Sequence, residues 1–298
     1  MNDDFARRRI NVGQFASLSR QAASGPRSIA LTSIGHILLA EDNPISQVVS
    51  RAMVETLGFH VDVVANGSEA VRAATSSAYQ AILMDCQMPL LDGYQATREI
   101  RRIEGAKRRT PILAITALPA RSASRHCLAT GMDDFVTKPL SIEALAGVLR
   151  RWTSCTTGPG ISIHPTTPSG VEGDVVATPS TWAVLDLNVL NRLGGLGRAR
   201  GEDLADRLTA LFYTDAVAQL VAMHQALASS DCGAMVLSAH ILGGSGADLG
   251  AVLLSRLCVT LATDAHEGDL VDAKMQLEAI EGEIGRVRIA LAAWSTTR

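Results

Sequence analysis

Met84-Asp85-Cys86-Gln87-Met88-Pro89, residues 84–89, indicates the fold more directly than any other segment of this chain. It completes the apolar run 81–84, so a strand-like segment ends on the carboxylate of Asp85 and a loop follows at once. In open α/β sheets, ligands bind in the crevice beyond the carboxyl ends of the strands. The sequence therefore predicts that Asp85 points into a ligand-binding crevice.

Three further apolar runs end on polar side chains in the same way. The side chains that follow runs 36–40, 111–115 and 135–137 are Glu41 and Asp42, Thr116, and Lys138, respectively. Three carboxylates, a hydroxyl and an ammonium would thus meet at one edge of a parallel sheet. Such a set of groups can bind a divalent metal ion and a phosphoryl group together.

Strand-like runs alternate with amphipathic helical stretches through residues 35–152. The runs are 36–40, 60–64, 81–85, 111–116 and 134–137, and the helical stretches begin near Pro44, Ser68, Gly93, Pro119 and Ser141. This alternation predicts an α/β domain over 35–152, with a five-stranded parallel sheet and helices on both faces.

The segments on either side of this domain differ in composition. Residues 1–34 lack clear periodicity and are predicted to form a disordered or irregular tail. Residues 153–180 hold 4 Gly, 4 Pro and 10 Ser or Thr among 28 residues, which is typical of a linker. A flexible chain of that length has an end-to-end distance of roughly 30 Å.

Residues 181–298 have a helical pattern throughout, which predicts an all-α bundle. The expected helices are 186–194, 201–229, 231–247, 249–265 and 269–293. Gly194-Gly195 is expected to separate the first helix from the second. Asp231 and Asp269 are expected to cap the third and fifth helices.

Composition narrows the class of protein. The net charge of −3 and the absence of a recognition element argue against nucleic-acid binding. No run approaches the roughly 18 apolar residues that span a bilayer, so direct membrane insertion is not expected. The 5 cysteines are scattered without a CxxC pair, which indicates reduced thiols in a cytoplasmic protein.

The first domain resembles the receiver domain of two-component response regulators and hybrid histidine kinases. The resemblance covers about residues 35–152. The segments that carry it are Leu39-Ala40-Glu41-Asp42-Asn43, residues 84–93, Ile115-Thr116-Ala117 and residues 133–140. It implies a flavodoxin-like fold.

The resemblance also implies a role for each polar residue. Asp85 would be the phosphoacceptor, and Mg²⁺ would be the cofactor. Thr116 and Lys138 would contact the phosphoryl group, Phe135 would rotate with Thr116 as a switch, and the Lys138-Pro139 bond would be cis. The expected magnesium ligands are Asp42, Asp85, the backbone carbonyl of Gln87, and Glu41 through a water molecule.

A phosphatase with an aspartate nucleophile is the competing enzyme class. Such an enzyme typically has a second acid two residues after the nucleophile, and here that position is Gln87. The sequence therefore favours a signalling receiver over a hydrolase.

The bundle contains one histidine in an unusual setting. Met235, Ala239, Leu242, Gly246 and Leu249 form a stripe that should face the core, and His240 lies off that stripe. The neighbours of His240 on its own helix face are Gly243, Gly244 and Ala247, all very small. Adjacent glycines cost roughly 1 kcal/mol each relative to Ala in a helix, so we expect them to form a docking surface that approaches the imidazole.

This stretch resembles the histidine-containing phosphotransfer domain, over about residues 183–293. In that family an Ala-His-x-Leu-Lys-Gly-Ser-like run is followed by a Leu-Gly pair. Gly243 stands where the family usually has a lysine. The resemblance implies that His240 carries a phosphoryl group, while Gly243 leaves the rate of transfer in question.

The predicted function is a phosphorelay signalling protein. Asp85 would accept a phosphoryl group from an upstream histidine kinase, and His240 would exchange it with a receiver, either downstream or within the chain. No ATP-binding kinase motif is visible, so the chain is expected to be a phosphotransfer protein, possibly a piece of a hybrid kinase, rather than an enzyme. The alternative is a receiver switch whose bundle only docks or dimerises.

Overall fold

The computed structural model describes residues 35–105, 109–117, 120–153 and 184–296. These residues all belong to one compact unit. The predicted tail at 1–34, nearly all of the predicted linker at 153–180 and the expected helix start at Pro119 lie outside the described residues.

The first domain is built on a five-stranded parallel sheet, as predicted. The strand order is β2-β1-β3-β4-β5, which is the flavodoxin-like order. The strands are β1 (Gly35–Ala40), β2 (Phe59–Val64), β3 (Ala81–Asp85), β4 (Ile112–Thr116) and β5 (Asp134–Thr137). Both β3 and β4 are buried along their whole length, because helices cover both faces of the sheet.

Five helices wind around this sheet, and side chains in their preceding loops cap several of them. The helices are α1 (Pro44–Thr56), α2 (Gly67–Ser76), α3 (Gly93–Glu104), α4 (Ala120–Ala129) and α5 (Ile142–Trp152). Asn43 caps α1 and Asp92 caps α3 by accepting backbone N–H groups of the first turn. Alternate strand residues supply two separate cores, one under α1 and α5 and the other under α2 and α3.

The second domain is helical, also as predicted. Its helices are α6 (Leu187–Arg200), α7 (Leu204–Ser229), α8 (Cys232–Asp248), α9 (Val252–His266) and α10 (Ala273–Thr296). Helix α8 packs between α7 and α9, and α10 packs against α7 and α9, which gives a bundle of long helices. None of the helices in the described ranges is long and apolar enough to cross a membrane.

Two expected helix boundaries in the bundle, the end of the first helix and the start of the last, differ most from the structure. Helix α6 continues through Gly194-Gly195 and ends at Arg200, where Gly201, with a φ of +66°, caps it. The burial of Leu193 and Leu196 on either side of the glycines offsets their poor helix propensity. Helix α10 begins at Ala273, so Asp269 does not cap it.

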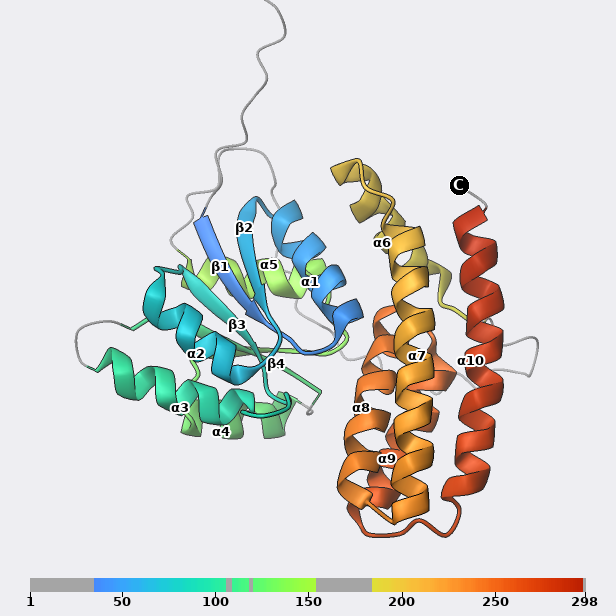
Figure 1. Ribbon diagram of the computed structural model, residues 1–298. Helices are drawn as coiled ribbons and strands as arrows, with labels where there is room; N and C mark the ends of the chain where they lie inside the picture. Colours follow the sequence, from blue (N-terminus) through green and yellow to red (C-terminus); the bar gives the residue numbers. More distant parts are fainter. Residues whose placement is uncertain (1–34, 106–108, 118–119, 154–183, 297–298) are drawn as a thin grey trace, which may run out of the picture. The chain divides into compact units, whose positions relative to one another are not determined.

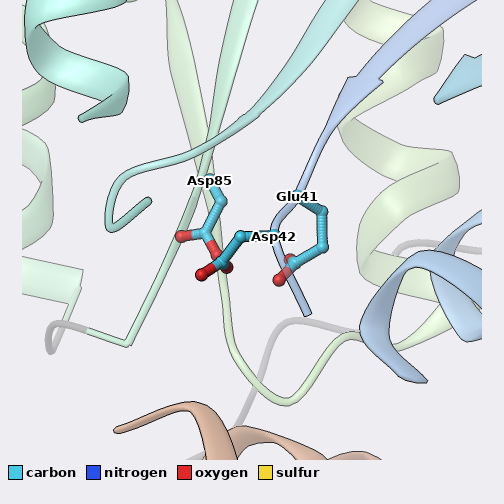
Figure 2. A group of neighbouring side chains, drawn as sticks. All are labelled: Glu41, Asp42 and Asp85. Atoms are coloured by element: carbon cyan, nitrogen blue, oxygen red, sulfur yellow. The ribbon is translucent and has the colours of Figure 1, made fainter. Parts of the chain in front are cut away.

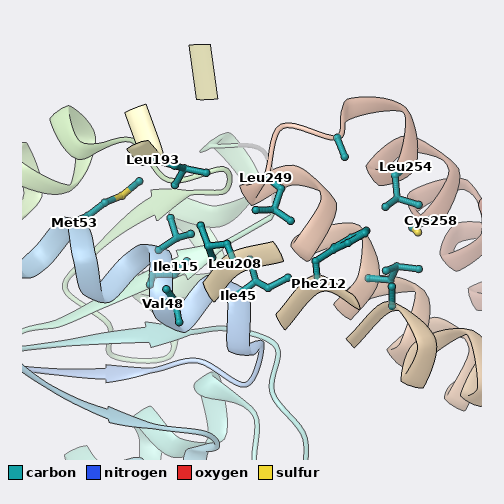
Figure 3. Close-up of a cluster of buried hydrophobic side chains, with 14 of the residues drawn as sticks. Ile45, Val48, Met53, Ile115, Leu193, Leu208, Phe212, Leu249, Leu254 and Cys258 are labelled. Carbon is teal, nitrogen blue, oxygen red and sulfur yellow. The ribbon is translucent and has the colours of Figure 1, made fainter. Parts of the chain in front are cut away.

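The cap expected at Asp231 is confirmed, because its side chain accepts the Ala234 N–H. Asp269 instead accepts the Val271 N–H in the turn that precedes α10. The stripe expected to face the bundle core is also buried as predicted, and Leu249 lies with Phe212 and Leu254 in the apolar cluster of Figure 3.

Candidate functional site

The carboxyl ends of β1 and β3 bring three acidic side chains together. These two strands are neighbours in the sheet, with Ala40 opposite Met84, so Glu41, Asp42 and Asp85 follow at the same edge. One carboxylate oxygen of each lies within 4.8 Å of those of the other two. Figure 2 shows the three side chains converging at the ends of these strands.

Lys138, at the end of β5, closes the pocket with a positive charge. Its Nζ lies 2.7 Å from Asp85 Oδ2 and 3.1 Å from Glu41 Oε2. The Lys138-Pro139 peptide is cis, as expected. The pocket therefore holds three carboxylates and one ammonium.

The pocket is shielded from water, and its charges perturb one another. Burial, reinforced by the charge of Asp85, raises the pKa of Asp42 to about 6. The same two causes raise the pKa of Glu41 well above its ordinary value. Burial disfavours the Lys138 ammonium, but the charges of Asp85 and Glu41 outweigh it and raise the pKa of Lys138. An excess of negative charge in a partly dry pocket favours a bound cation.

The pocket fits a magnesium ion by the chemistry of its donors. Mg²⁺ prefers oxygen ligands and is commonly held by one or two carboxylates together with water and phosphate oxygens. The buried Oε2 atom of Glu41 has no hydrogen-bond partner among the described residues, although Lys138 lies nearby. Glu41, Asp42 and Asp85 are the residues that would hold the ion.

We expect Mg²⁺ to bind less tightly as the pH falls through about 6, because protons then compete for Asp42. The raised pKa means that Asp42 is ionised above this value and protonated below it. Affinity should fall by up to about tenfold per pH unit below pH 6. Calorimetric titration with MgCl₂ across this range measures it.

Asp62→Asn is the matched control for that titration, because Asp62 lies on β2 away from the pocket, where it accepts a hydrogen bond from Tyr79. This variant should keep the wild-type pH dependence, whereas Asp42→Asn should bind weakly at every pH. An affinity that is flat through pH 6 would contradict the assignment of Asp42.

Three further residues expected at the site occupy different positions around it. The buried Thr116 ends β4, and its hydroxyl is hydrogen-bonded to Tyr94. The Gln87 N–H donates to Asp85 Oδ1 over 3.0 Å. Phe135 on β5 is partly buried and packs against the core on the α2 and α3 side of the sheet.

His240 lies on α8 and is partly buried. A cavity of about 590 Å³ separates it from the receiver pocket. The cavity is lined by Gln87, Lys138 and Pro139 on one side and by His240 and other residues of α8 and α9 on the other. Burial and then the charge of Lys138 lower the pKa of His240 below its ordinary value, so the imidazole is neutral at pH 7.

The small residues beside His240 all line this cavity with it, and two of them also lie close to other elements. A side chain added at Gly243 would place its Cβ 3.1 Å from Cys258 Cβ on α9, so Gly243 is a helix-packing residue. A Cβ at Gly244 would instead lie 3.8 Å from Asn43 Nδ2 of the first domain. Ala247 is partly buried and lines the cavity. Close packing of α8 on α9 therefore explains the glycine at 243.

We expect Gly243→Lys to lower the free energy of unfolding by about 1–3 kcal/mol, because the new Cβ would force α8 and α9 apart. Gly282→Lys on α10 is the matched control, since a Cβ there meets nothing within 4 Å. The free energy of unfolding of that control should rise by roughly 0.5–1 kcal/mol, because lysine has a higher helix propensity than glycine. Urea denaturation of both variants measures the difference, and equal effects at the two positions would rule out the packing role.

A second group of polar residues, which sequence reasoning did not predict, lies between the two domains. Asn43 Nδ2 donates to Ser245 Oγ over 2.8 Å and to the Ile241 carbonyl over 2.9 Å. The Ser46 hydroxyl donates to Asp248 Oδ2. The only hint in the sequence is that α1 carries apolar residues on more than one face, more than packing on the sheet requires.

Comparison with known families agrees with the two folds. Residues 37–150 match the response regulator receiver domain, and residues 207–290 match the Hpt domain. Residues 37–150 are thus a receiver domain and residues 207–290 an Hpt domain, and together these domains are those of phosphorelay signal transduction.

Curated relatives include histidine kinases. The chain is 31% identical over 271 residues to the sensor histidine kinase GacS of Pseudomonas protegens, covering 90% of this chain and 28% of that protein. It is 34% identical over 161 residues to histidine kinase 5 of Arabidopsis thaliana, covering 46% and 18%. The chain thus spans about a quarter of the GacS length.

Among solved structures, the receiver domain of sensor histidine kinase PA1611 from Pseudomonas aeruginosa, with a coordinated magnesium ion, is 47% identical. The match covers 41% of this chain and 98% of that one, with a TM-score of 0.38. A co-crystal structure of Saccharomyces cerevisiae Ypd1 with the receiver domain of Ssk1 matches at 30% identity, covering 40% and 88%, with a TM-score of 0.37.

Proposed function

We propose that Asp85 accepts a phosphoryl group from the phosphohistidine of an upstream histidine kinase, and that His240 exchanges this group with a receiver aspartate. The observation that carries the proposal is the position of the Asp85 carboxylate. It lies at a strand end, between two further carboxylates and the Lys138 ammonium.

Each residue of the pocket has its own role in the first step, the transfer to Asp85. The Asp85 carboxylate oxygen attacks phosphorus, and the bond from phosphorus to the donor imidazole nitrogen breaks. Lys138, which lies 2.7 Å from Asp85, is placed to neutralise charge on the phosphoryl oxygens, and Thr116 can donate a hydrogen bond to them. When bound, Mg²⁺ supplies additional neutralisation of the phosphoryl charge. The backbone N–H of Gln87 orients Asp85.

His240 is suited to the second step because its imidazole is neutral. A neutral ring has one nitrogen lone pair free to attack a phosphoryl group. Gly244 has no side chain and Ala247 has only a methyl group, so they leave room for a receiver to approach. The chain itself acts as acceptor and carrier, and the ATP-dependent step belongs to the partner kinase.

We assign the relay to the cytoplasm. Cys86, Cys127 and Cys258 are free, buried thiols, which suits a reducing compartment. The partners that the two domains imply, histidine kinases and other receiver or Hpt domains, would meet the chain there.

The direct test is transfer from a purified, autophosphorylated histidine kinase, read by intact mass and by peptide mapping. We expect phosphate on Asp85 as a base-labile acyl phosphate and on His240 as an acid-labile phosphoramidate. Chelation of Mg²⁺ with EDTA should abolish labelling. No labelling at either residue, with a kinase that labels another receiver, would overturn the proposal.

Gly243 supports a second candidate function, in which the bundle docks but does not carry phosphate. The cation that the family usually places beside the histidine is missing. The same experiment distinguishes the two functions, since a docking module would leave all label on Asp85.

A further inference from the structure

Helix α1 of the receiver contacts the bundle along its whole length. At its start, Asn43 donates to Ser245 and to the backbone of α8. Within the first turn, the Ser46 hydroxyl donates to Asp248. At the last turn, Glu55 forms an ion pair with Arg200 of α6. These pairs link one receiver helix to two helices of the bundle.

The polar groups at the α8 end of this contact are largely buried, whereas the side chains of Glu55 and Arg200 are 18% and 21% exposed and also pair with Arg51 and Glu202 within their own domains. Asn43, Ser46 and Ser245 are at most 3% exposed. The Asn43 carbonyl oxygen already accepts the Ile45 and Ser46 N–H groups, and only its NH₂ group reaches the bundle. An unpaired buried polar group costs about 1–3 kcal/mol. A receiver that lacked the matching hydrogen-bonding groups would therefore bind the bundle more weakly.

Apolar contacts fill the space between the polar pairs. Val48 and Ala52 are 8% and 3% exposed, and they share a small pocket with Leu204 and Arg200 of the bundle. Figure 3 shows Ile45 and Val48 of α1 in one buried cluster with Leu208 of α7. The contact thus combines an apolar centre with polar pairs at both ends, as specific interfaces do.

We propose that the receiver partner of the bundle is the receiver of the same chain, and that Ser46–Asp248 and Glu55–Arg200 are the pairs that select it. This inference rests on the proposed function. Phosphoryl transfer from Asp85 to His240 would then be intramolecular. The P–O bond to Asp85 breaks, a P–N bond to His240 forms, and the carboxylate leaves with the bonding electron pair.

The chemistry of the pairs identifies the partner. A receiver needs a hydroxyl where Ser46 lies to pair with Asp248, and a carboxylate where Glu55 lies to pair with Arg200. The receiver of this chain supplies both. Joining the two domains by one chain also raises their effective concentration to the millimolar range, which a free receiver would have to match.

The test measures how fast label reaches His240 in the full chain as the protein is diluted. After Asp85 is loaded from a phosphorylated kinase and the kinase is removed, the first-order rate should not depend on concentration. A mixture of Asp85→Asn and His240→Gln chains can transfer only between molecules. That mixture should be slower than wild type and should slow further on dilution.

Charge reversal tests the selecting pair. Arg200→Glu should slow transfer within the chain about tenfold, because two carboxylates would then face each other. The double variant Glu55→Arg/Arg200→Glu should recover most of the rate. The control is Arg198→Glu, an exposed position on α6 about 200° around the helix from Arg200, which should behave as wild type.

The outcomes separate the two proposals. If His240 is labelled but its rate rises in proportion to protein concentration, docking within the chain is wrong and the relay stands. If the charge-swapped double variant is no faster than Arg200→Glu, the pair does not select the partner. If no variant ever carries phosphohistidine, the relay through His240 itself fails.

Discussion

Asp85→Asn is expected to reduce phosphoryl uptake from a histidine kinase by about 1,000-fold or more, because an amide cannot act as the nucleophile. The substitution keeps the shape of the side chain and leaves Lys138 its contact with Glu41. Folding should therefore be retained while chemistry is lost. The measurement is intact mass after incubation with phosphorylated kinase and Mg²⁺.

Asp92→Asn is the matched control for that variant. Asp92 lies only seven residues further along the chain, where it caps α3 by accepting the Gln95 N–H over 2.6 Å. Asparagine is also a good capping residue, so this variant should be labelled as wild type. Wild-type labelling of the Asp85→Asn chain would show that another residue accepts the phosphoryl group.

The second large effect is expected for His240→Gln, which should stop transfer beyond Asp85. Glutamine resembles the imidazole in size and polarity, but it has no nitrogen lone pair to attack phosphorus. The label should then remain on Asp85 as an acyl phosphate. His224→Gln is the control, since His224 is exposed on α7 near Glu281 and away from the cavity. Phosphohistidine in the His240→Gln chain would refute the assignment.

The wild-type protein should also show a distinctive pH dependence at this step. Burial and Lys138 lower the pKa of His240, so its imidazole stays neutral as the pH falls through the ordinary value of about 6.5. Transfer to His240 should therefore hold through this range and decline only at lower pH. A decline that begins above pH 6.5 would show that the histidine is not buried during transfer.

Sequence alone predicted the pocket of three carboxylates and Lys138, because each of these residues directly follows an apolar run. Once five such runs alternate with helices, the sheet must be parallel, and its strand ends must share an edge. The convergence of Asp42, Asp85 and Lys138 follows from that topology and from local pattern alone. The cap of α8 at Asp231 was predictable for the same reason, since capping depends on neighbours within one turn.

Helix ends and glycines in the bundle depended on tertiary packing. Gly194-Gly195 indicated a break, but burial of the flanking leucines holds α6 together across it. Gly243 was predicted to lie on the docking surface; it lines the cavity beside His240 and also packs against Cys258 of α9, which the sequence pattern did not indicate. A propensity scale gives the local cost of a glycine but not which surface lies opposite it.

What the sequence determined, then, is the set of reactive groups, since their order along the chain fixes them at one sheet edge and on one helix. Which surface of one domain contacts which surface of the other depends on tertiary packing. The local pattern at Asn43 and Ser46 predicts only an ordinary helix start. Their side chains nevertheless form hydrogen bonds with residues of α8 that lie about 200 positions further along the chain. Such a pairing depends on how two finished surfaces fit, and no periodicity within either segment carries that information.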